Sequence, residues 1–206
     1  MSLEIISCKV CLLGTSAVGK SCIATRYTEN KFQEDIQCTT FASFCKKVVD
    51  SDVGPVQLNI WDTAGQERFR ALGKHFYKDA FIICLVYDIT KKETFEDIKN
   101  IWYPDLQKYG EQYTVIALIG NKMDLYTNEE VSTIEAENYA KEIGAIFQLV
   151  SAKNGRGIDE IFEQLVIAYT EPEFSMKINK IKERKRGSFR FKKTSNKIKK
   201  KECCQL

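Results

Sequence analysis

The sequence predicts an α/β fold: a six-stranded, mostly parallel sheet with one antiparallel edge strand and helices on both faces. Three observations lead to this class. Apolar runs of strand length alternate with longer segments of helical periodicity, which is the pattern of successive βαβ units. The turn-rich residues 51–55 join the second and third runs, so these two strands form a hairpin. A glycine-bounded loop follows the first run and leads into a helix-like stretch.

The elements can be assigned in order from these patterns. We expect strands where the apolar runs lie, at residues 5–13, 42–50, 56–62, 80–88, 114–120 and 145–150. We expect helices in the periodic stretches between and after them, at residues 19–29, 67–77, 93–109, 132–143 and 158–169. Phe95, Ile98 and Trp102 have helical spacing, so this face of the third helix belongs to the core.

The loop after the first strand reads G-x-x-x-x-G-K-S over residues 14–21. Its glycines let several backbone N–H groups point at one polyphosphate, and the helix N-terminus adds the positive end of its dipole. Lys20 can reach the β- and γ-phosphates, and the Ser21 hydroxyl suits Mg²⁺. An eight-residue pattern also occurs by chance. This one is informative because it predicts further segments of a nucleotide site later in the chain.

A second polar segment, residues 62–66, ends the third strand with the sequence DTAGQ. A carboxylate at a strand end beside the loop, Asp62, can hold the metal through water. The N–H of Gly65 can come close to a γ-phosphate, and Gln66 can orient a water for in-line attack on it.

Two more polar segments follow the last two strands. Residues 121–124 read NKMD, and Asp124 can accept both N–H groups on the Watson–Crick edge of guanine, which adenine cannot supply. The backbone of Ser151, Ala152 and Lys153 could close the base pocket. Each segment alone is a common surface loop, but four of them in this order, each after a strand, indicate one nucleotide site.

These segments resemble the Ras superfamily of small GTPases and, within it, the Rab family. The residues 61–69, WDTAGQERF, and 85–90, LVYDIT, are close to Rab sequences. The resemblance covers residues 5 to about 170 and the last four residues. No Rho-type insertion follows Asp124, and Ser2 stands where the Arf type has its myristoylated glycine. The resemblance implies a P-loop G domain that binds GTP or GDP with Mg²⁺ and hydrolyses GTP.

The resemblance also implies the site residues. Gln66 is the catalytic residue, and Ser21, Thr39 and Asp62 hold the metal. The nucleotide is contacted by Gly14, Ser16, Ala17, Val18, Gly19, Lys20, Ser21, Cys22, Phe32, Thr39, Gly65, Asn121, Lys122, Asp124, Ser151, Ala152 and Lys153. Ser16 occupies the loop position where bulk obstructs hydrolysis, and a small serine is compatible with it.

The polar residues 30–41 form a switch segment that a ligand would order. Distance from Ser21 matches Thr39 to the family's metal-binding threonine, which senses the γ-phosphate, with Thr40 as the alternative. The same matching gives Phe32 as the aromatic that packs on the base, although it could be a plain loop anchor. Rab proteins usually carry Gly where this chain has Phe41, so the surface that faces effectors should differ here.

Three further aromatic residues, Phe44, Trp61 and Phe76, resemble the triad through which Rab proteins meet their effectors. Core packing is the alternative interpretation, and for Trp61 both apply. The single histidine, His75, lies in the second switch and is given no catalytic role.

Charge divides the chain into a small GTPase domain, residues 1–172, and a basic tail, residues 173–206, which we expect to be disordered. From Ser175 onward 13 Lys or Arg face two acids, a net charge of +11, whereas the rest carries −8. The ending CCQL resembles a prenylation signal on Cys203 and Cys204, and a lipid with basic residues is a sufficient anchor. A solvated arm and a nucleic-acid-binding arm are the alternatives.

Other features restrict the class of protein. The remaining six cysteines are scattered among apolar neighbours, as in a reducing compartment, and Cys8 and Cys11 point to opposite faces of a strand and belong to the core. The apolar run from Ala80 to Tyr87 is too short to span a bilayer, and Glu4 and Lys9 argue against a signal peptide.

The family implies a monomeric switch of vesicle-mediated protein transport on the cytoplasmic face of an intracellular membrane, with a cytosolic pool. Its partners would be an exchange factor, a GTPase-activating protein, effectors that read the switches, and the prenylation and extraction machinery, with no nucleic acid. Two alternatives differ in class: a module that binds nucleotide without useful hydrolysis, and a nucleic-acid-binding protein that works through its tail.

Overall fold

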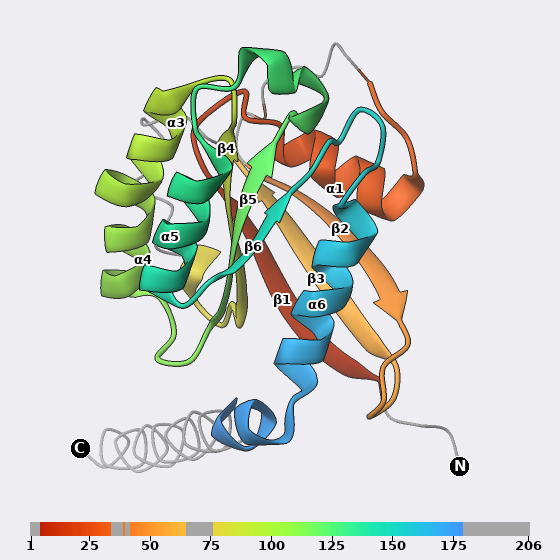
Figure 1. Cartoon of the computed structure of the whole chain (residues 1–206). Coiled ribbons are helices and arrows are strands. Elements are labelled where there is room, and N and C mark those ends of the chain that lie inside the picture. Colours follow the sequence, from red (N-terminus) through yellow and green to blue (C-terminus); the bar gives the residue numbers. More distant parts are fainter. Residues whose placement is uncertain (1–4, 34–38, 40–41, 65–75, 179–206) are drawn as a thin grey trace, which may run out of the picture. The chain divides into compact units, whose positions relative to one another are not determined.

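The molecule is organised around a six-stranded sheet in the order β2-β3-β1-β4-β5-β6 (Figure 1). The computed structural model describes residues 5–33, 39, 42–64 and 76–178. Its chain divides into two units, Met1–Thr170 and Glu171–Leu206, and the sheet belongs to the first.

All neighbouring strands run parallel except β2 and β3, which pair antiparallel. The strands are β1 (Ile6–Leu13), β2 (Ala42–Val49), β3 (Val56–Thr63), β4 (Ile82–Asp88), β5 (Val115–Asn121) and β6 (Ile146–Leu149). The predicted fold class is therefore confirmed, and every predicted strand boundary lies within two residues of the observed one.

Helices cover both faces of the sheet, with α1 and α6 on one face and α3, α4 and α5 on the other (Figure 1). The helices are α1 (Lys20–Glu29), α3 (Lys92–Asp97), η2 (Ile98–Trp102), α4 (Tyr103–Tyr109), η3 (Met123–Asn128), α5 (Thr133–Ile143) and α6 (Ile158–Thr170). Residues 76 and 77 of the predicted helix 67–77 are helical, and the rest of it lies outside the described residues.

The predicted single helix over residues 93–109 differs from the structure in its middle. There α3 passes into a π-helical turn, Ile98–Trp102, before α4 begins. Pro104, in the first turn of α4, has no N–H to donate, and its ring would clash with the carbonyl four residues earlier. A widened turn immediately before a proline removes this conflict, and such turns are a recognised cause of helix irregularity.

Local sequence fixes the ends of α5. The Ser132 side chain accepts a hydrogen bond from the N–H of Glu135 at 3.2 Å, so Ser132 is the N-cap rather than the first helical residue. At the other end Gly144 adopts φ 66°, and its N–H bonds to carbonyls of the last turn.

The core fills the space on both sides of the sheet. All seven residues of β4 are buried, as expected of a central strand covered by helices on both faces. On the α1–α6 side the ring of Tyr27 stacks on that of Phe162, with centroids 3.8 Å apart. On the other side Phe95 is fully buried between the rings of Tyr87 and Tyr139.

In the second unit the structure differs from the predicted disorder where the tail begins, because residues 172–178 are helical. The N–H of Ser175 donates to the carbonyl of Glu171 at 2.9 Å, and Lys177 lies 3.9 Å from Glu173 in an i,i+4 ion pair. The rest of the predicted tail lies outside the described residues. Across the parts of the chain that the structure describes, no helix has the length and apolar character needed to cross a membrane.

We expect Phe95→Ala to lower the free energy of unfolding by about 3–5 kcal/mol, because it leaves a cavity between two aromatic rings. Phe44→Ala is the matched control, since this phenylalanine on β2 is 52% exposed and its truncation leaves no cavity. Urea unfolding of both variants at one fixed GDP concentration measures the difference. Equal losses of unfolding free energy in the two variants would mean that Phe95 does not stabilise the core on this side of the sheet.

Candidate functional site

The glycine-bounded loop of residues 14–19 leaves the carboxyl end of β1 and enters α1. Its backbone curls through three residues with positive φ: Gly14 at 143°, Ala17 at 65° and Gly19 at 95°. The buried ammonium of Lys20 donates to the carbonyls of Gly14 at 2.7 Å and Thr15 at 2.8 Å. The loop therefore holds one buried positive charge beside a helix N-terminus, a combination that attracts a phosphate.

Two of the loop positions require glycine because of close approach. A Cβ on Gly14 would overlap the backbone carbonyl of Val86 on the neighbouring strand. A Cβ on Gly19 would overlap the side-chain amide nitrogen of Asn121. The sequence indicated glycine for backbone freedom, and the structure adds that neither position has room for a side chain.

The predicted metal-binding residues come together from three segments. The Ser21 hydroxyl donates to Oδ2 of Asp62 at 2.6 Å, and the Thr39 hydroxyl donates to the same oxygen at 3.2 Å. The two hydroxyl oxygens are 2.9 Å apart. Asp62 is 1% exposed, and its other oxygen, Oδ1, has no hydrogen-bond partner among the described residues.

These groups fit a hard divalent cation. Mg²⁺ prefers oxygen ligands and is usually bound through one or two carboxylates or hydroxyls together with phosphate oxygens and water. A buried carboxylate oxygen without a partner is costly, so a cation or an ordered water beside it would be stabilising. A fourth residue, Ser43 on β2, also donates to Oδ2 of Asp62, at 3.2 Å. Sequence reasoning missed Ser43 because nothing in its local pattern marks it.

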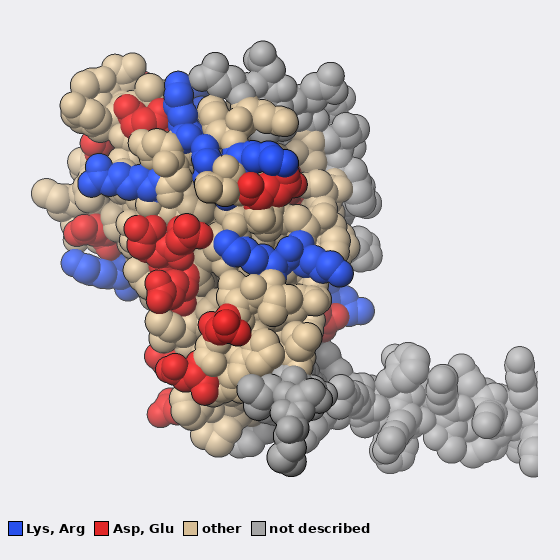
Figure 2. Space-filling view, turned by 90° about the vertical axis from the view of Figure 1, so that its right-hand side faces the viewer, with Lys and Arg blue, Asp and Glu red and all other residues tan. Residues whose placement is uncertain are grey.

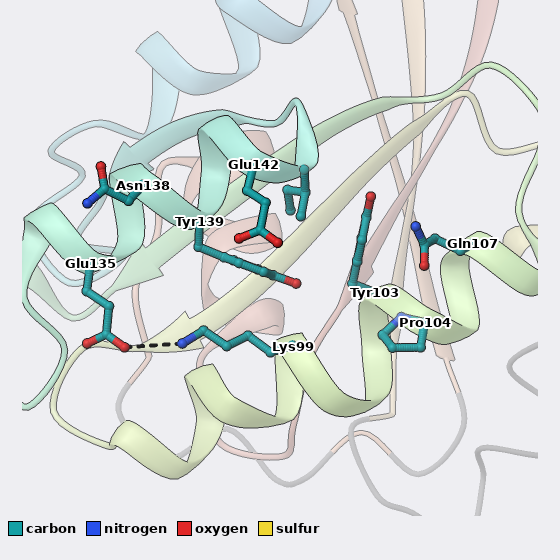
Figure 3. A pocket seen from close by; sticks show the side chains of 9 residues that line it. Lys99, Tyr103, Pro104, Gln107, Glu135, Asn138, Tyr139 and Glu142 are labelled. Carbon is teal, nitrogen blue, oxygen red and sulfur yellow. Dashed lines mark hydrogen bonds and ion pairs between the residues drawn. The ribbon is translucent and has the colours of Figure 1, made fainter.

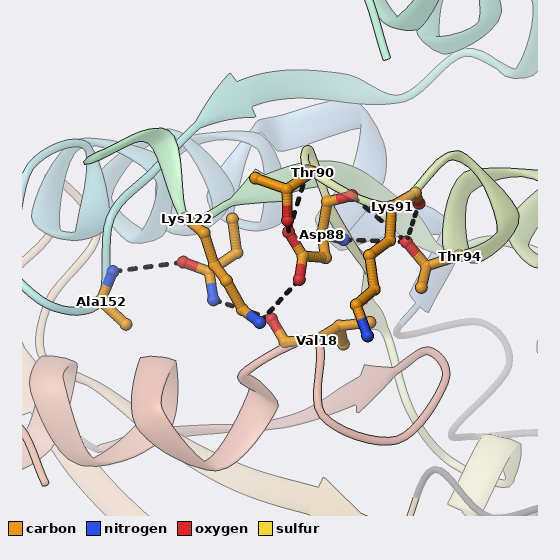
Figure 4. Close-up of polar contacts among 8 residues, drawn as sticks. Val18, Asp88, Thr90, Lys91, Thr94, Lys122 and Ala152 are labelled. Atoms are coloured by element: carbon orange, nitrogen blue, oxygen red, sulfur yellow. Dashed lines mark hydrogen bonds and ion pairs between the residues drawn. The ribbon is translucent and has the colours of Figure 1, made fainter. Parts of the chain in front are cut away.

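The side-chain amide of Asn121 joins two loops. Its Nδ2 donates to the carbonyl of Val18 at 2.8 Å, and its Oδ1 accepts from the N–H of Ala152 at 3.2 Å (Figure 4). Asn121 is 2% exposed and stands at the carboxyl end of β5. The phosphate-loop segment and the segment 151–153 are therefore held against the same residue.

Asp124 lies next to the segment that follows β6. Its Oδ1 accepts a hydrogen bond from the Ser151 hydroxyl at 2.6 Å. Ser151 is fully buried, whereas Asp124 is half-buried in η3. The Ser151 hydroxyl thus orients the carboxylate, which has further lone pairs for a ligand.

Lys122 makes an ion pair that the sequence did not predict. Its ammonium lies 2.6 Å from Oδ2 of Asp88, which is 1% exposed at the end of β4 (Figure 4). The N–H and hydroxyl of Thr90 donate to Oδ1 of the same aspartate at 3.0 and 2.7 Å. The signal that could have identified Asp88 is the one used for Asp62, an acid at the end of an apolar strand.

The other predicted contacts differ in exposure. Ser16, Cys22 and Phe32 are half-buried, and Lys153 is exposed. Burial raises the pKa of the Cys22 thiol, so this side chain stays uncharged beside the phosphate loop. Gly65, Gln66 and Phe41, and the alternative Thr40, lie outside the described residues.

Three comparisons with known proteins bear on this arrangement. The model of the Ras family matches residues 9–171. Human Ras-related protein Rab-22A is 46% identical over 157 residues, which are 76% of this chain and 80% of that protein. Ras-related protein Rab-21 of Bos taurus is 45% identical over 159 residues, or 77% of this chain and 71% of that protein. The chain belongs to the Ras family, as a Rab protein.

Ras-family proteins are GTPases, so this Rab protein binds guanine nucleotide and hydrolyses GTP, and Rab proteins act in vesicle traffic. The four segments that carry the resemblance all follow carboxyl ends of strands, where open α/β sheets bind ligands.

The aromatic triad of this Rab protein forms a contiguous row. The Trp61 ring centroid lies 5.3 Å from that of Phe44 and 6.2 Å from that of Phe76. Phe44 is 52% exposed and Trp61 is half-buried, but Phe76 is 8% exposed. Phe76 packs into the core beside Trp61, which agrees with the core-packing alternative for this residue.

A hollow of about 600 Å³ lies elsewhere on the Rab domain, between η2–α4 and α5 (Figure 3). The Lys99 ammonium at its edge lies 3.1 Å from the Glu135 carboxylate. The hollow is lined by Lys99, Tyr103, Pro104, Gln107, Glu135, Asn138, Tyr139, Glu142 and Ile143. None of these residues belongs to the four nucleotide-site segments, so the hollow is separate from that site.

We expect Gly19→Ala to weaken the binding of a fluorescent GDP analogue at least about tenfold, because the new methyl group would displace Asn121. Gly144→Ala is the matched control. It also has positive φ but no atom within 4 Å of the added Cβ, so it adds backbone strain of about 1–2 kcal/mol without touching the site. Fluorescence titration measures the affinities, and equal losses in both variants would contradict the role of close approach.

Proposed function

We propose that this Rab protein is a membrane-anchored switch whose two nucleotide states differ in the order of residues 30–41. The observation that carries the proposal is the contact of Ser21, Thr39 and Asp62, which come from α1, the switch segment and β3. Thr39 connects this segment to the end of β3, where the γ-phosphate of GTP would lie. Losing the γ-phosphate would remove a contact that only the triphosphate supplies.

Ser21, Thr39 and Asp62 would hold Mg²⁺, with Asp62 acting through water. When bound, this ion neutralises charge on the β- and γ-phosphates. Lys20 would exchange its two loop carbonyls for phosphate oxygens, because its ammonium already points into the loop. The Ser21 and Thr39 hydroxyls, which now share Oδ2 of Asp62, would turn toward the cation.

Asp124 would select guanine by accepting the N–H groups on its Watson–Crick edge. Ser151 supports this role because its hydroxyl holds one carboxylate oxygen in place. The N–H of Ala152 and the side chain of Asn121 would keep the closing loop against the base. Adenine offers an acceptor where guanine offers a donor, so a fixed carboxylate would reject it.

Gln66 would orient the attacking water, and the N–H of Gly65 would contact the γ-phosphate. Of the two arginines in the described ranges, Arg26 donates to backbone carbonyls of residues 152 and 153, and Arg156 is exposed on the loop before α6. Neither stands at the phosphate end of the site. As in related GTPases, we expect intrinsic turnover to be slow, with an arginine supplied by a GTPase-activating protein.

Exchange factors and effectors would act on the switch segment and on the surface formed by exposed Phe44 and half-buried Trp61. Residues 192–206 would attach the protein to the cytoplasmic face of an intracellular membrane through prenylated Cys203 and Cys204 and a lysine-rich stretch. On the face seen in Figure 2, lysine and arginine alternate with acidic side chains and form no continuous basic patch.

Base selection gives a direct test. Asp124→Asn should weaken GDP binding by about 100-fold or more and improve the binding of xanthosine diphosphate, because the amide presents a donor where the carboxylate accepted one. Competition against a fluorescent GDP analogue measures both affinities. Wild-type protein that binds ADP as tightly as GDP would contradict the guanine assignment.

The switch is tested by Thr39→Ala. We expect this variant to keep its GDP affinity within about threefold, whereas its affinity for a non-hydrolysable GTP analogue falls about tenfold and depends less on Mg²⁺. Ser43→Ala is the control, since it also removes a hydroxyl from Asp62 but lies outside the switch segment. If Thr39→Ala lowers the affinities for GDP and for the GTP analogue equally, Thr39 does not sense the γ-phosphate.

The anchor is tested by replacing Cys203 and Cys204 with serine in protein expressed in a prenylating cell. The +11 tail remains, so any residual membrane binding should be lost at moderate salt through screening. Flotation with vesicles at low and high salt measures this. A double-serine protein that stays on membranes at high salt would show that the terminal cysteines are not the anchor.

A further inference from the structure

Arg26, in the last turn of α1, reaches the loop that follows β6. Its Nε donates to the carbonyl of Ala152 at 2.8 Å, and its Nη2 donates to the carbonyl of Lys153 at 2.6 Å. The two residues are 126 and 127 positions away in the chain. Two donors of one planar guanidinium therefore hold two successive carbonyls of this loop.

The third nitrogen of the same guanidinium binds a residue close by in the chain, Asn30. Nη1 donates to the backbone carbonyl of Asn30 at 3.0 Å and to its side-chain Oδ1 at 3.1 Å. Asn30 ends α1 in the left-handed conformation, with φ 53°, and residues 30–41 begin there. Arg26 thus fixes the first residue of the switch segment as well as the loop at residues 152 and 153.

The loop that Arg26 holds is also the loop that borders the proposed base site. The N–H of Ala152 donates to Asn121, and the Ser151 hydroxyl donates to Asp124. Arg26 binds the carbonyls of Ala152 and Lys153, while Asn121 binds the N–H of Ala152. Arg26 and Asn121 therefore both hold this loop, and Arg26 also binds Asn30.

We infer that Arg26 is a positioning residue that sets how long the nucleotide stays bound, by coupling the base-side loop to the start of the switch segment. The inference rests on the proposed base site. Movement of loop 151–153 away from the base site would break hydrogen bonds from a charged donor, which are stronger than neutral ones, and would open that side of the site. Displacing Asn30, as an exchange factor acting on the switch segment would, pulls on the same guanidinium.

Three variants separate this role from ordinary helix capping. Arg26→Ala removes every donor. Arg26→Lys keeps the charge near the helix C-terminus, but its single ammonium cannot serve the four acceptor atoms that the planar guanidinium reaches. Asn30→Gly removes the Oδ1 acceptor and keeps the left-handed backbone accessible. Arg156→Ala is the matched control, since it removes an exposed arginine from the same loop.

The measurement is the dissociation rate of a fluorescent GDP analogue from full-length protein in excess Mg²⁺ and unlabelled GDP. We expect dissociation to be about tenfold faster for Arg26→Ala, equivalent to about 1.4 kcal/mol, and severalfold faster for Arg26→Lys. Asn30→Gly should be less than about threefold faster, and Arg156→Ala unchanged. Hydrogen exchange should accelerate at residues 151–155 in both Arg26 variants and stay unchanged in α5.

The outcomes are distinguishable. If the wild-type protein fails to retain GDP, the proposed nucleotide site is wrong. If the wild type retains GDP and Arg26→Lys releases it at the wild-type rate, the charge alone suffices and the positioning role is overturned. If Arg26→Ala misfolds, the Arg26→Lys result decides, and uniform acceleration of exchange across the domain would assign Arg26 to helix stability instead.

Discussion

The side-chain amide of Asn121 makes two hydrogen bonds on which the geometry of the whole site depends. Its donor reaches a carbonyl in the phosphate loop 103 positions earlier in the chain, and its acceptor takes the N–H of Ala152. Because Asn121 is buried, breaking either bond would leave a polar group unsatisfied, at a cost of about 1–3 kcal/mol. The amide also explains Gly19, since any larger residue there would displace it.

At the phosphate end of the site, Asp62 joins several segments as Asn121 does at the base end. A carboxylate that is 1% exposed is expensive to bury without compensation, and here three hydroxyl groups converge on one of its oxygens. The other oxygen has no partner in the described parts of the chain. The site is thus a preorganised arrangement of acceptors and hydroxyls that is completed only by a cation or water.

The sequence was sufficient for the order and type of elements because apolar periodicity and turn residues are local signals. The strands and the helices α1, α5 and α6 follow from them. The π-helical turn before Pro104 was missed, since the pattern of apolar residues continues through it. The helix at residues 172–178 was missed because the composition of the tail as a whole suggested disorder.

The nucleotide site was likewise predicted only in part. Residues within contiguous motifs were identified by their types and spacing. Asp88, Ser43 and Arg26 were assigned no role, because each acts through a partner far away in the chain that no local pattern specifies. Phe76 shows the limit of residue matching, which gave its position in the triad but not its burial.

The position of β2 at the edge of the sheet has a mechanical consequence. This strand bonds to β3 on one side, whereas β3, β1, β4 and β5 each have two neighbours. Residues 30–41 lead directly into β2, so a force applied to them is transmitted into a single ladder of hydrogen bonds. Strand β2 can fray from Ala42 inward while the pairing of β1 with β3 and β4 is unaffected. The strands β1, β3 and β5, which position three of the four nucleotide-site segments, each keep at least one other strand pairing when β2 frays.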